Sequence, residues 1–177
     1  DLLGALVAAP MVVPPTVLGY YLLLTLGRTS PIGQVYESVT GSPIVFTKTA
    51  AIVAATIVAV PLVVRSARAA IEDVDPRLAA AASTLGASPM RVFLTILLPL
   101  AAHGILAGIT LGFARALGDF GVTLMLAGDI PGLTQTGALA IYDSVQANQE
   151  ARAAGMVGIL SGLAIAALYV GDRLARR

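Results

Sequence analysis

Four stretches of this chain are apolar over nearly the length that a helix needs to cross a lipid bilayer. They cover residues 2–26, 46–64, 92–113 and 155–170. A transmembrane helix needs about 20 consecutive apolar residues, because the hydrocarbon core of a bilayer is about 30 Å thick. The sequence therefore predicts an all-α, polytopic membrane helical bundle, with four spans in a single transmembrane domain over residues 1–177.

The composition supports this class and excludes several others. Hydrophobic residues make up 57% of the chain and charged residues only 12%, about half the charged share of a soluble domain. Without cysteine, and with His103 as the single histidine, the chain has no means to form a disulfide, a thiolate nucleophile or a Cys/His metal site. The net charge of +1 argues neither for nor against a nucleic-acid partner, but the sequence has no basic patch of the kind that nucleic-acid binding needs.

Prolines and a short apolar piece complicate the simple pattern of four spans. Pro10 and the pair Pro14 and Pro15 fall inside the first stretch. The apolar piece 120–127 is too short to span a bilayer. It is interpreted either as a re-entrant segment or as an extension of the third span beyond a kink at Gly118.

The distribution of arginine predicts the orientation of the chain. The segment 65–91 and the C-terminal tail are rich in arginine: Arg65, Arg68, Arg77, Arg91, Arg173, Arg176 and Arg177. Cytoplasmic segments carry an excess of positive charge, so we expect a cytoplasmic loop 65–91 and a cytoplasmic C-terminus. Four spans then place Asp1 inside as well. Because the chain begins with Asp1 and shows no cationic leader region, we expect it to be truncated at its N-terminus.

The loop 65–91 contains the signals of two helices separated by a tight turn. Asp75 followed by proline is a helix start, because the carboxylate caps free N–H groups and proline tolerates the first helical position. Gly86 is a typical left-handed stop. Ser88 with Pro89 repeats the start signal, and the second helix is predicted to be interrupted at Pro99.

One face of the first predicted helix carries Leu78, Ala82 and Leu85. Such a smooth surface fits a groove on another protein. The alternative is that this alanine face packs against the protein's own spans, and spacing alone favours that alternative.

The same region resembles the signature of ABC importer permeases, the binding-protein-dependent transport system inner membrane family. That signature is Glu-Ala-Ala, three residues, Gly, nine residues and Ile-x-Leu-Pro; this chain departs from it only where Ala80 replaces the glutamate. The resemblance implies a type I permease bundle whose loop couples to a cytoplasmic ATP-hydrolysing subunit. The coupling residues that it implies are Ala80, Ala81, Ala82, Leu85, Gly86, Ala87, Ser88, Pro89, Ile96, Leu98 and Pro99.

Further blocks are similar to the molybdate-type permease subunits, namely 9–33, 67–88, 98–123 and 128–142. Two departures are Asp119, where the family usually has glutamate, and His103, where it often has proline. The resemblance implies import of molybdate or tungstate across a bacterial or archaeal cytoplasmic membrane. The partners it implies are a second copy of the chain, two ATP-binding subunits that hold ATP and Mg²⁺, and an external oxyanion-binding protein. Sulfate or thiosulfate permeases remain the alternative.

The chain itself is predicted to bind no cofactor and no metal, and to be no enzyme. It has no phosphate-binding loop, and Lys48, the only lysine, has no glycine-rich neighbourhood. An intramembrane enzyme would need clustered catalytic groups, which the spans lack, and an autonomous channel would need no ordered docking loop. Both are weaker alternatives.

Arg115 and Asp119 are the most informative polar residues of the predicted spans. They are four residues apart and so share a helix face. Ionisable groups at this depth usually face a bundle interior or a water-filled cavity. The pair is interpreted either as part of the anion path or its gate, or as a static ion pair. The path or gate is predicted to comprise Arg115, Gly118, Asp119, Phe120, Gly121 and Thr123.

The two glycines of this group have an alternative role in close helix packing. On the outer side, Thr134, Gln135 and Thr136 offer hydrogen-bond donors for hand-over of the oxyanion, although such residues also build ordinary turns. His103 is interpreted as a hydrogen-bonded packing residue. Four tyrosines are interpreted as membrane-interface anchors: Tyr20, Tyr21, Tyr142 and Tyr169.

Overall fold

The computed structural model describes residues 2–175, and within that range it contains helices and no strand. The predicted positions of Asp1, Arg176 and Arg177 lie outside the described residues. In chain order the elements are α1 (Leu2–Val12), α2 (Pro15–Leu26), α3 (Pro31–Thr40), α4 (Lys48–Glu72), α5 (Pro76–Thr84), α6 (Pro89–Val92), the π-helix η1 (Phe93–Leu97), α7 (Leu98–Leu117), α8 (Gly121–Ala127), α9 (Gly137–Gln146) and α10 (Glu150–Ala175).

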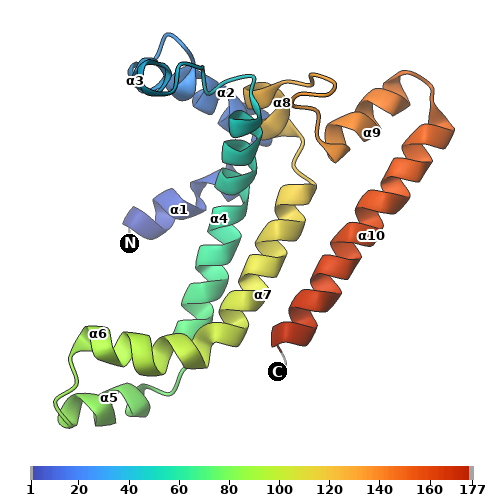
Figure 1. Cartoon of the computed structure of the whole chain (residues 1–177). Coiled ribbons are helices and arrows are strands. Elements are labelled where there is room, and N and C mark those ends of the chain that lie inside the picture. Colours follow the sequence, from blue (N-terminus) through green and yellow to red (C-terminus); the bar gives the residue numbers. More distant parts are fainter. Residues whose placement is uncertain (1, 176–177) are drawn as a thin grey trace.

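Three helical runs are long and apolar enough to cross a membrane, which confirms the predicted class. They are α4, the run Pro89–Leu117 and most of α10, with 25, 29 and 25 residues. In Figure 1, α4 and α7 lie side by side, α5 and α6 lie at the lower end, and α3 and α9 lie at the upper end. The C-terminal end of α10 lies at the lower end, together with the arginine-rich loop. This arrangement agrees with the sidedness that the arginines predict.

The first apolar stretch forms two helices instead of one straight helix. α1 and α2 meet at an angle of 119°. Pro14 is extended, with a ψ of 137°, because the ring of Pro15 disfavours the helical conformation of the residue before it. Pro15 then starts α2 at its first helical position. Only the bent pair taken together has the length and apolarity of a fourth span.

Close approach of α4 and α7 depends on glycines along one face of α7. A Cβ atom added at Gly108 would lie 2.5 Å from Cβ of Ser66, and one at Gly112 would lie 2.7 Å from Cγ2 of Val63. Between membrane helices there is little hydrophobic driving force, so small residues that permit close packing are favoured at the contact. This contact forms the central pair of the bundle.

The short apolar piece is a helix of its own, α8, held between α2 and α4 at the upper end. Five of its seven residues are buried. A Cβ atom at Gly121 would lie 2.8 Å from Cβ of Pro15, and one at Gly19 would lie 2.6 Å from Cβ of Met125. The chain breaks after α7 at Gly118, where the second interpretation placed a kink, but the helix that follows packs against α2 and α4. α8 is therefore a packed element and no continuation of the third span.

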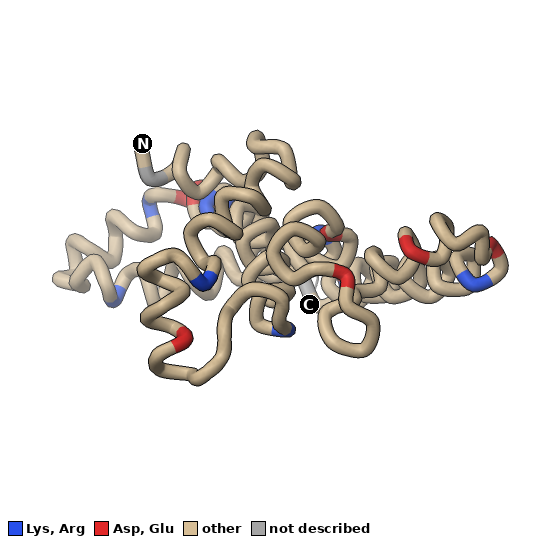
Figure 2. The backbone as a smooth tube through the Cα atoms, turned by 90° about the horizontal axis from the view of Figure 1, so that it is seen from above, with Lys and Arg blue, Asp and Glu red and all other residues tan. Residues whose placement is uncertain are grey.

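α10 contacts α7 and α9, and Figure 1 shows it on the side of α7 away from α4. Only 6% of the most apolar stretch of α10 is buried within the chain. Figure 2 shows few charged positions, scattered along a tube that is otherwise uncharged. The exposed faces of the long helices thus suit lipid or another membrane subunit.

Candidate functional site

The loop between α4 and η1 has the helix–turn–helix form that the sequence predicts. Oδ1 of Asp75 accepts a hydrogen bond of 2.9 Å from the N–H of Arg77, at the start of α5. Oγ of Ser88 accepts one of 3.4 Å from the N–H of Arg91, at the start of α6. Both capping predictions are confirmed.

Gly86 makes the turn between the two helices. Its φ is +83°, in the left-handed region that glycine adopts without steric penalty. Its N–H donates to the carbonyl of Ser83 at 3.0 Å, and the N–H of Ala87 donates to the carbonyl of Ala82 at 3.1 Å. This pair of bonds is the Schellman motif, which satisfies the last carbonyls of a helix. No atom lies within 4 Å of the place of a Cβ atom, so backbone conformation alone requires glycine here.

The loop stands away from the spans and exposes apolar side chains. α5 has no buried residue, and its substantial contacts are with α6 and η1. Leu85 is 88% exposed and Met90 is 66% exposed. The alanine face of α5 therefore does not pack against the long helices, contrary to the alternative that spacing favoured. An ordered element with exposed apolar residues is suited to contact another protein.

The predicted interruption at Pro99 takes the form of a π-helical segment. Proline lacks an N–H, and its ring clashes with the carbonyl four residues earlier in an α-helix. In η1 the register shifts by one residue, and the N–H of Leu98 donates to the carbonyl of Phe93, five residues earlier. The helix therefore continues through Pro99, and in Figure 1 the run changes direction between α6 and α7.

The structure brings the predicted pair Arg115 and Asp119 together. Their nearest charged atoms, Nη1 and Oδ1, lie 3.8 Å apart, and the side chains are 40% and 2% exposed. Asp119 has closer partners in Thr123. Its Oδ2 accepts a 3.0 Å hydrogen bond from the backbone N–H of Thr123 and one of 2.7 Å from its hydroxyl. Asp119 thus holds the start of α8 more firmly than it holds Arg115.

The direct bond between Asp119 and Thr123 was not predicted, although both residues were placed in the candidate path. The signal was present in the sequence, because an aspartate just before a helix commonly accepts hydrogen bonds from its first N–H groups. Phe120 lies between the two residues in the chain and packs on Tyr142 of α9, with ring centroids 4.9 Å apart. Tyr142, which was expected to be an interface anchor, thus also joins α9 to the linker before α8, and it stays 47% exposed.

The two glycines of the candidate path differ in their surroundings. Gly121 is crowded by Pro15, as described above, so close packing explains why glycine is needed there. Gly118 ends α7 with a φ of −92°, and no atom lies nearer than 4.0 Å to the place of a Cβ atom. Of the two, only Gly118 would accept a Cβ atom without a close contact.

The three predicted hand-over residues all have hydrogen-bond partners, either in their own loop or in α9. The buried hydroxyl of Thr134 donates to the carbonyl of Gly128 and accepts from the N–H of Ile130, both at 3.1 Å. Thr136 caps α9. Nε2 of Gln135 lies 3.5 Å from a carboxylate oxygen of Asp143. These bonds fit the turn-building alternative.

His103 is exposed on α7, and among the described residues its imidazole makes no side-chain hydrogen bond. The interpretation of His103 as a hydrogen-bonded packing residue is therefore wrong. The described residues also contain no group of three His, Asp or Glu side chains close enough to hold a metal ion. The polar groups near the upper end hold helices together, and Asp119 lies beside the guanidinium of Arg115.

Comparison with known proteins identifies the family. The family described as "Binding-protein-dependent transport system inner membrane component" matches residues 1–177. The chain is 42% identical over 174 residues to the "Molybdenum transport system permease protein ModB" of Azotobacter vinelandii, an alignment that covers 97% of this chain and 77% of that protein. The identity is 41% to the protein of the same name from Haemophilus influenzae, over 100% of this chain and 78% of the relative. It is 42% to that of Escherichia coli, over 99% and 77%.

The family match covers the helix–turn–helix loop, the long helices and the Asp119 region alike. The three relatives, each more than 40% identical over nearly the whole chain, are all named molybdenum transport system permease proteins. The chain therefore belongs to the binding-protein-dependent transport system inner membrane components, and it is a multi-pass transport subunit and no enzyme.

Proposed function

We propose that the chain is the membrane-spanning permease subunit of an ATP-driven importer of molybdate in a bacterial or archaeal cytoplasmic membrane. Its relatives are named molybdenum transport permeases, and this supports the substrate. A tetrahedral dianion is very costly to move into hydrocarbon, so the protein must supply a polar route. Tungstate resembles molybdate in charge and shape and is a second substrate of the same class.

The coupling of this route to ATP hydrolysis rests on one observation, the ordered loop of α5, Gly86 and α6 with its exposed Leu85 and Met90. The sequence has no phosphate-binding loop, so ATP and Mg²⁺ belong to a partner subunit. The loop docks into a cleft on that subunit, and the exposed apolar side chains become buried there. The Schellman hydrogen bonds fix the turn, so the loop moves as one rigid element. When the ATP-binding subunit moves, the loop therefore moves α4 and η1 with it.

Two copies of the chain form the pathway between them, and two ATP-binding subunits hold the two loops. This arrangement is favoured by the large apolar exposure of the long helices. Access alternates between two arrangements of the bundle. Arg115 contributes positive charge to the anion path, and the segment from Gly118 to Thr123 forms the closure point beside it. An external oxyanion-binding protein delivers molybdate to the upper end near 134–136.

The test is co-purification of the cognate ATP-binding subunit with a loop variant. Burying a leucine side chain contributes about 2 kcal/mol, so Leu85→Ser should weaken the association by more than tenfold. Val39→Ser is the matched control, because Val39 is 80% exposed on α3 at the opposite end. Equal retention of the ATP-binding subunit by both variants would contradict the docking role of the loop.

The substrate is tested separately with the cognate binding protein. Its affinity for molybdate should exceed its affinity for sulfate, and uptake by the assembled transporter should follow the same order. Preference for sulfate would overturn the proposed substrate and leave the coupling role of the loop intact.

A further inference from the structure

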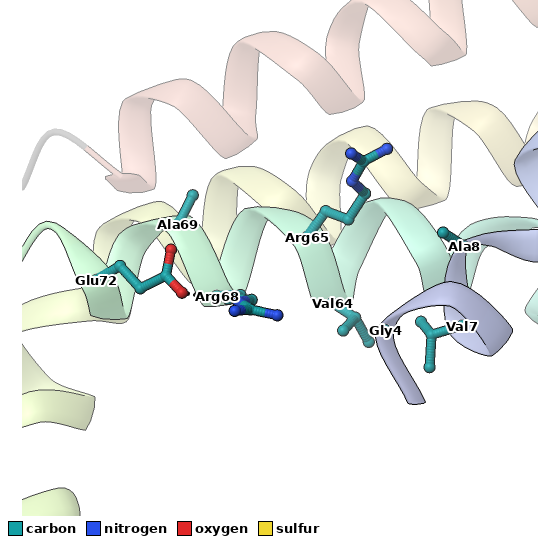
Figure 3. A pocket seen from close by; sticks show the side chains of 8 residues that line it. All are labelled: Gly4, Val7, Ala8, Val64, Arg65, Arg68, Ala69 and Glu72. Atoms are coloured by element: carbon teal, nitrogen blue, oxygen red, sulfur yellow. Dashed lines mark hydrogen bonds and ion pairs between the residues drawn. The ribbon is translucent and has the colours of Figure 1, made fainter. Parts of the chain in front are cut away.

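A cavity of about 680 Å³ lies between α1 and the lower half of α4. Figure 3 shows its walls: Val7 and Ala8 come from α1, and Val64, Arg65 and Arg68 come from α4. One part of the lining is therefore apolar, and the part nearer the end of α4 carries two guanidinium groups and the carboxylate of Glu72. The proposed transport role makes no use of this cavity.

The two arginines differ in their partners. Nε of Arg68 lies 2.7 Å from a carboxylate oxygen of Glu72, so its charge is at least partly balanced. Arg65 is exposed, and among the described residues its recorded polar contact is a 4.0 Å approach of Nη1 to the sulfur of Met11. A thioether is a weak acceptor and carries no charge. The cavity thus has a positive charge that the described residues do not neutralise.

The position of Arg65 along α4 places this charge at a membrane interface. Arg65 follows Lys48, the first residue of the helix, by 17 residues, a distance of about 25 Å at 1.5 Å per residue. A hydrocarbon core of about 30 Å therefore extends from the upper end of α4 to the neighbourhood of Arg65 and Arg68. Val7, Ala8 and Val64 lie on the hydrocarbon side of this boundary.

We propose that this cavity binds one anionic phospholipid of the lower, cytoplasmic leaflet. The headgroup phosphate accepts hydrogen bonds from the guanidinium of Arg65, and an acyl chain covers Val7, Ala8 and Val64. Basic pockets between helices on the cytoplasmic side are suited to acidic headgroups, because membrane charge and pocket charge are opposite. A soluble oxyanion would satisfy the arginine and leave the apolar wall exposed, whereas a phospholipid satisfies both.

The proposal is tested with the full chain purified from vesicles of phosphatidylcholine that contain one fifth phosphatidylglycerol. The retained lipids are counted by native mass spectrometry. Arg65→Gln should lower the ratio of retained phosphatidylglycerol to phosphatidylcholine roughly fivefold, the effect of one cation near an anionic surface. Arg173→Gln is the control, because it removes a charge from the same side of the membrane on α10. It should leave the ratio unchanged.

Two further variants protect the test against simple misfolding. Arg65→Lys keeps the charge and should retain most of the preference. Ala8→Phe fills the apolar wall and should lower phosphatidylglycerol retention without any change of charge. An unchanged ratio in Arg65→Gln would overturn the proposal, as would an equal loss in Arg173→Gln. Displacement of the lipid by millimolar molybdate or phosphate would overturn the proposal and assign the cavity to soluble oxyanions. Cross-linking of two copies of the chain through a cysteine placed at Ala8 would also overturn it and assign the cavity to the dimer contact.

Discussion

The carboxylate of Asp119 accepts two hydrogen bonds from Thr123, one from the backbone N–H at 3.0 Å and one from the hydroxyl at 2.7 Å. Arg115 is a more distant partner at 3.8 Å. The buried side chain of Asp119 therefore has two structural roles. It fixes the first turn of α8, and it holds a positive charge at the end of α7.

These two roles predict different effects on stability. Asp119→Ala should lower the free energy of unfolding by about 2 kcal/mol, because it leaves buried groups of Thr123 without an acceptor. Arg115→Ala should lower it by less than about 1 kcal/mol, since Arg115 is half-exposed and its ion pair is long. Thermal unfolding in detergent compares the two variants. A larger loss in Arg115→Ala would show that the main structural role of Asp119 is the ion pair with Arg115 and not its hydrogen bonds with Thr123.

The transport role of Arg115 is tested against another arginine in a similar ion pair. Arg28 lies 3.3 Å from Glu37 and is more exposed than Arg115. If Arg115 contributes charge to the anion path, Arg115→Ala should lower molybdate uptake about tenfold, equal to ~1.4 kcal/mol. Arg28→Ala should change uptake by less than about twofold, as expected for an exposed pair. Equal effects in reconstituted vesicles would make Arg115 a structural residue only.

Variants of the two glycines around Phe120 test two different roles, close packing at Gly121 and bending of the chain at Gly118. Gly121→Ala forces a methyl group against Pro15 and should destabilise the protein by about 1–3 kcal/mol. Gly118→Ala meets no neighbour within 3.5 Å and has an ordinary φ, so the resting structure should tolerate it. If the chain bends at Gly118 during transport, Gly118→Ala should slow uptake while the thermal midpoint stays within about 2 °C of the wild-type value. Normal uptake in this variant would remove Gly118 from the closure point.

The helix ends near the coupling loop were predictable because their signals are local. Asp75, Ser88 and Gly86 each act on backbone groups within a few residues, so the sequence carries the whole cause. Proline effects were only half predictable. Pro99 was expected to interrupt a helix, but a helix can also absorb a proline through a π segment, and the choice depends on the surrounding packing.

Features that depend on contacts between residues distant in sequence could not be predicted from local signals. Pro14 and Pro15 indicate a break between α1 and α2, but they do not give its angle of 119° or the close packing of α2 on α8 at Gly19 and Gly121. Tyr142 looked like an interface anchor because tyrosine is common there, and its contact with Phe120 appears only in the fold.

The coupling loop offers a matched pair of glycines for the most direct test of the account. Gly86 follows α5 and Gly41 follows α3, and both glycines have a positive φ, +83° and +73°. At neither position would an added Cβ atom have another atom within 4 Å. Replacing either by valine imposes the same kind of backbone strain, about 1–2 kcal/mol. Only Gly86 lies in the loop that is proposed to contact the ATP-binding subunit.

The decisive measurement is molybdate uptake and ATP hydrolysis by the assembled transporter in the same vesicles. Gly86→Val should insert normally, abolish uptake and leave ATP hydrolysis insensitive to the loaded binding protein, whereas Gly41→Val should keep the two activities coupled. Normal, coupled uptake by Gly86→Val would contradict the claim that this loop transmits the work of ATP hydrolysis to the membrane helices.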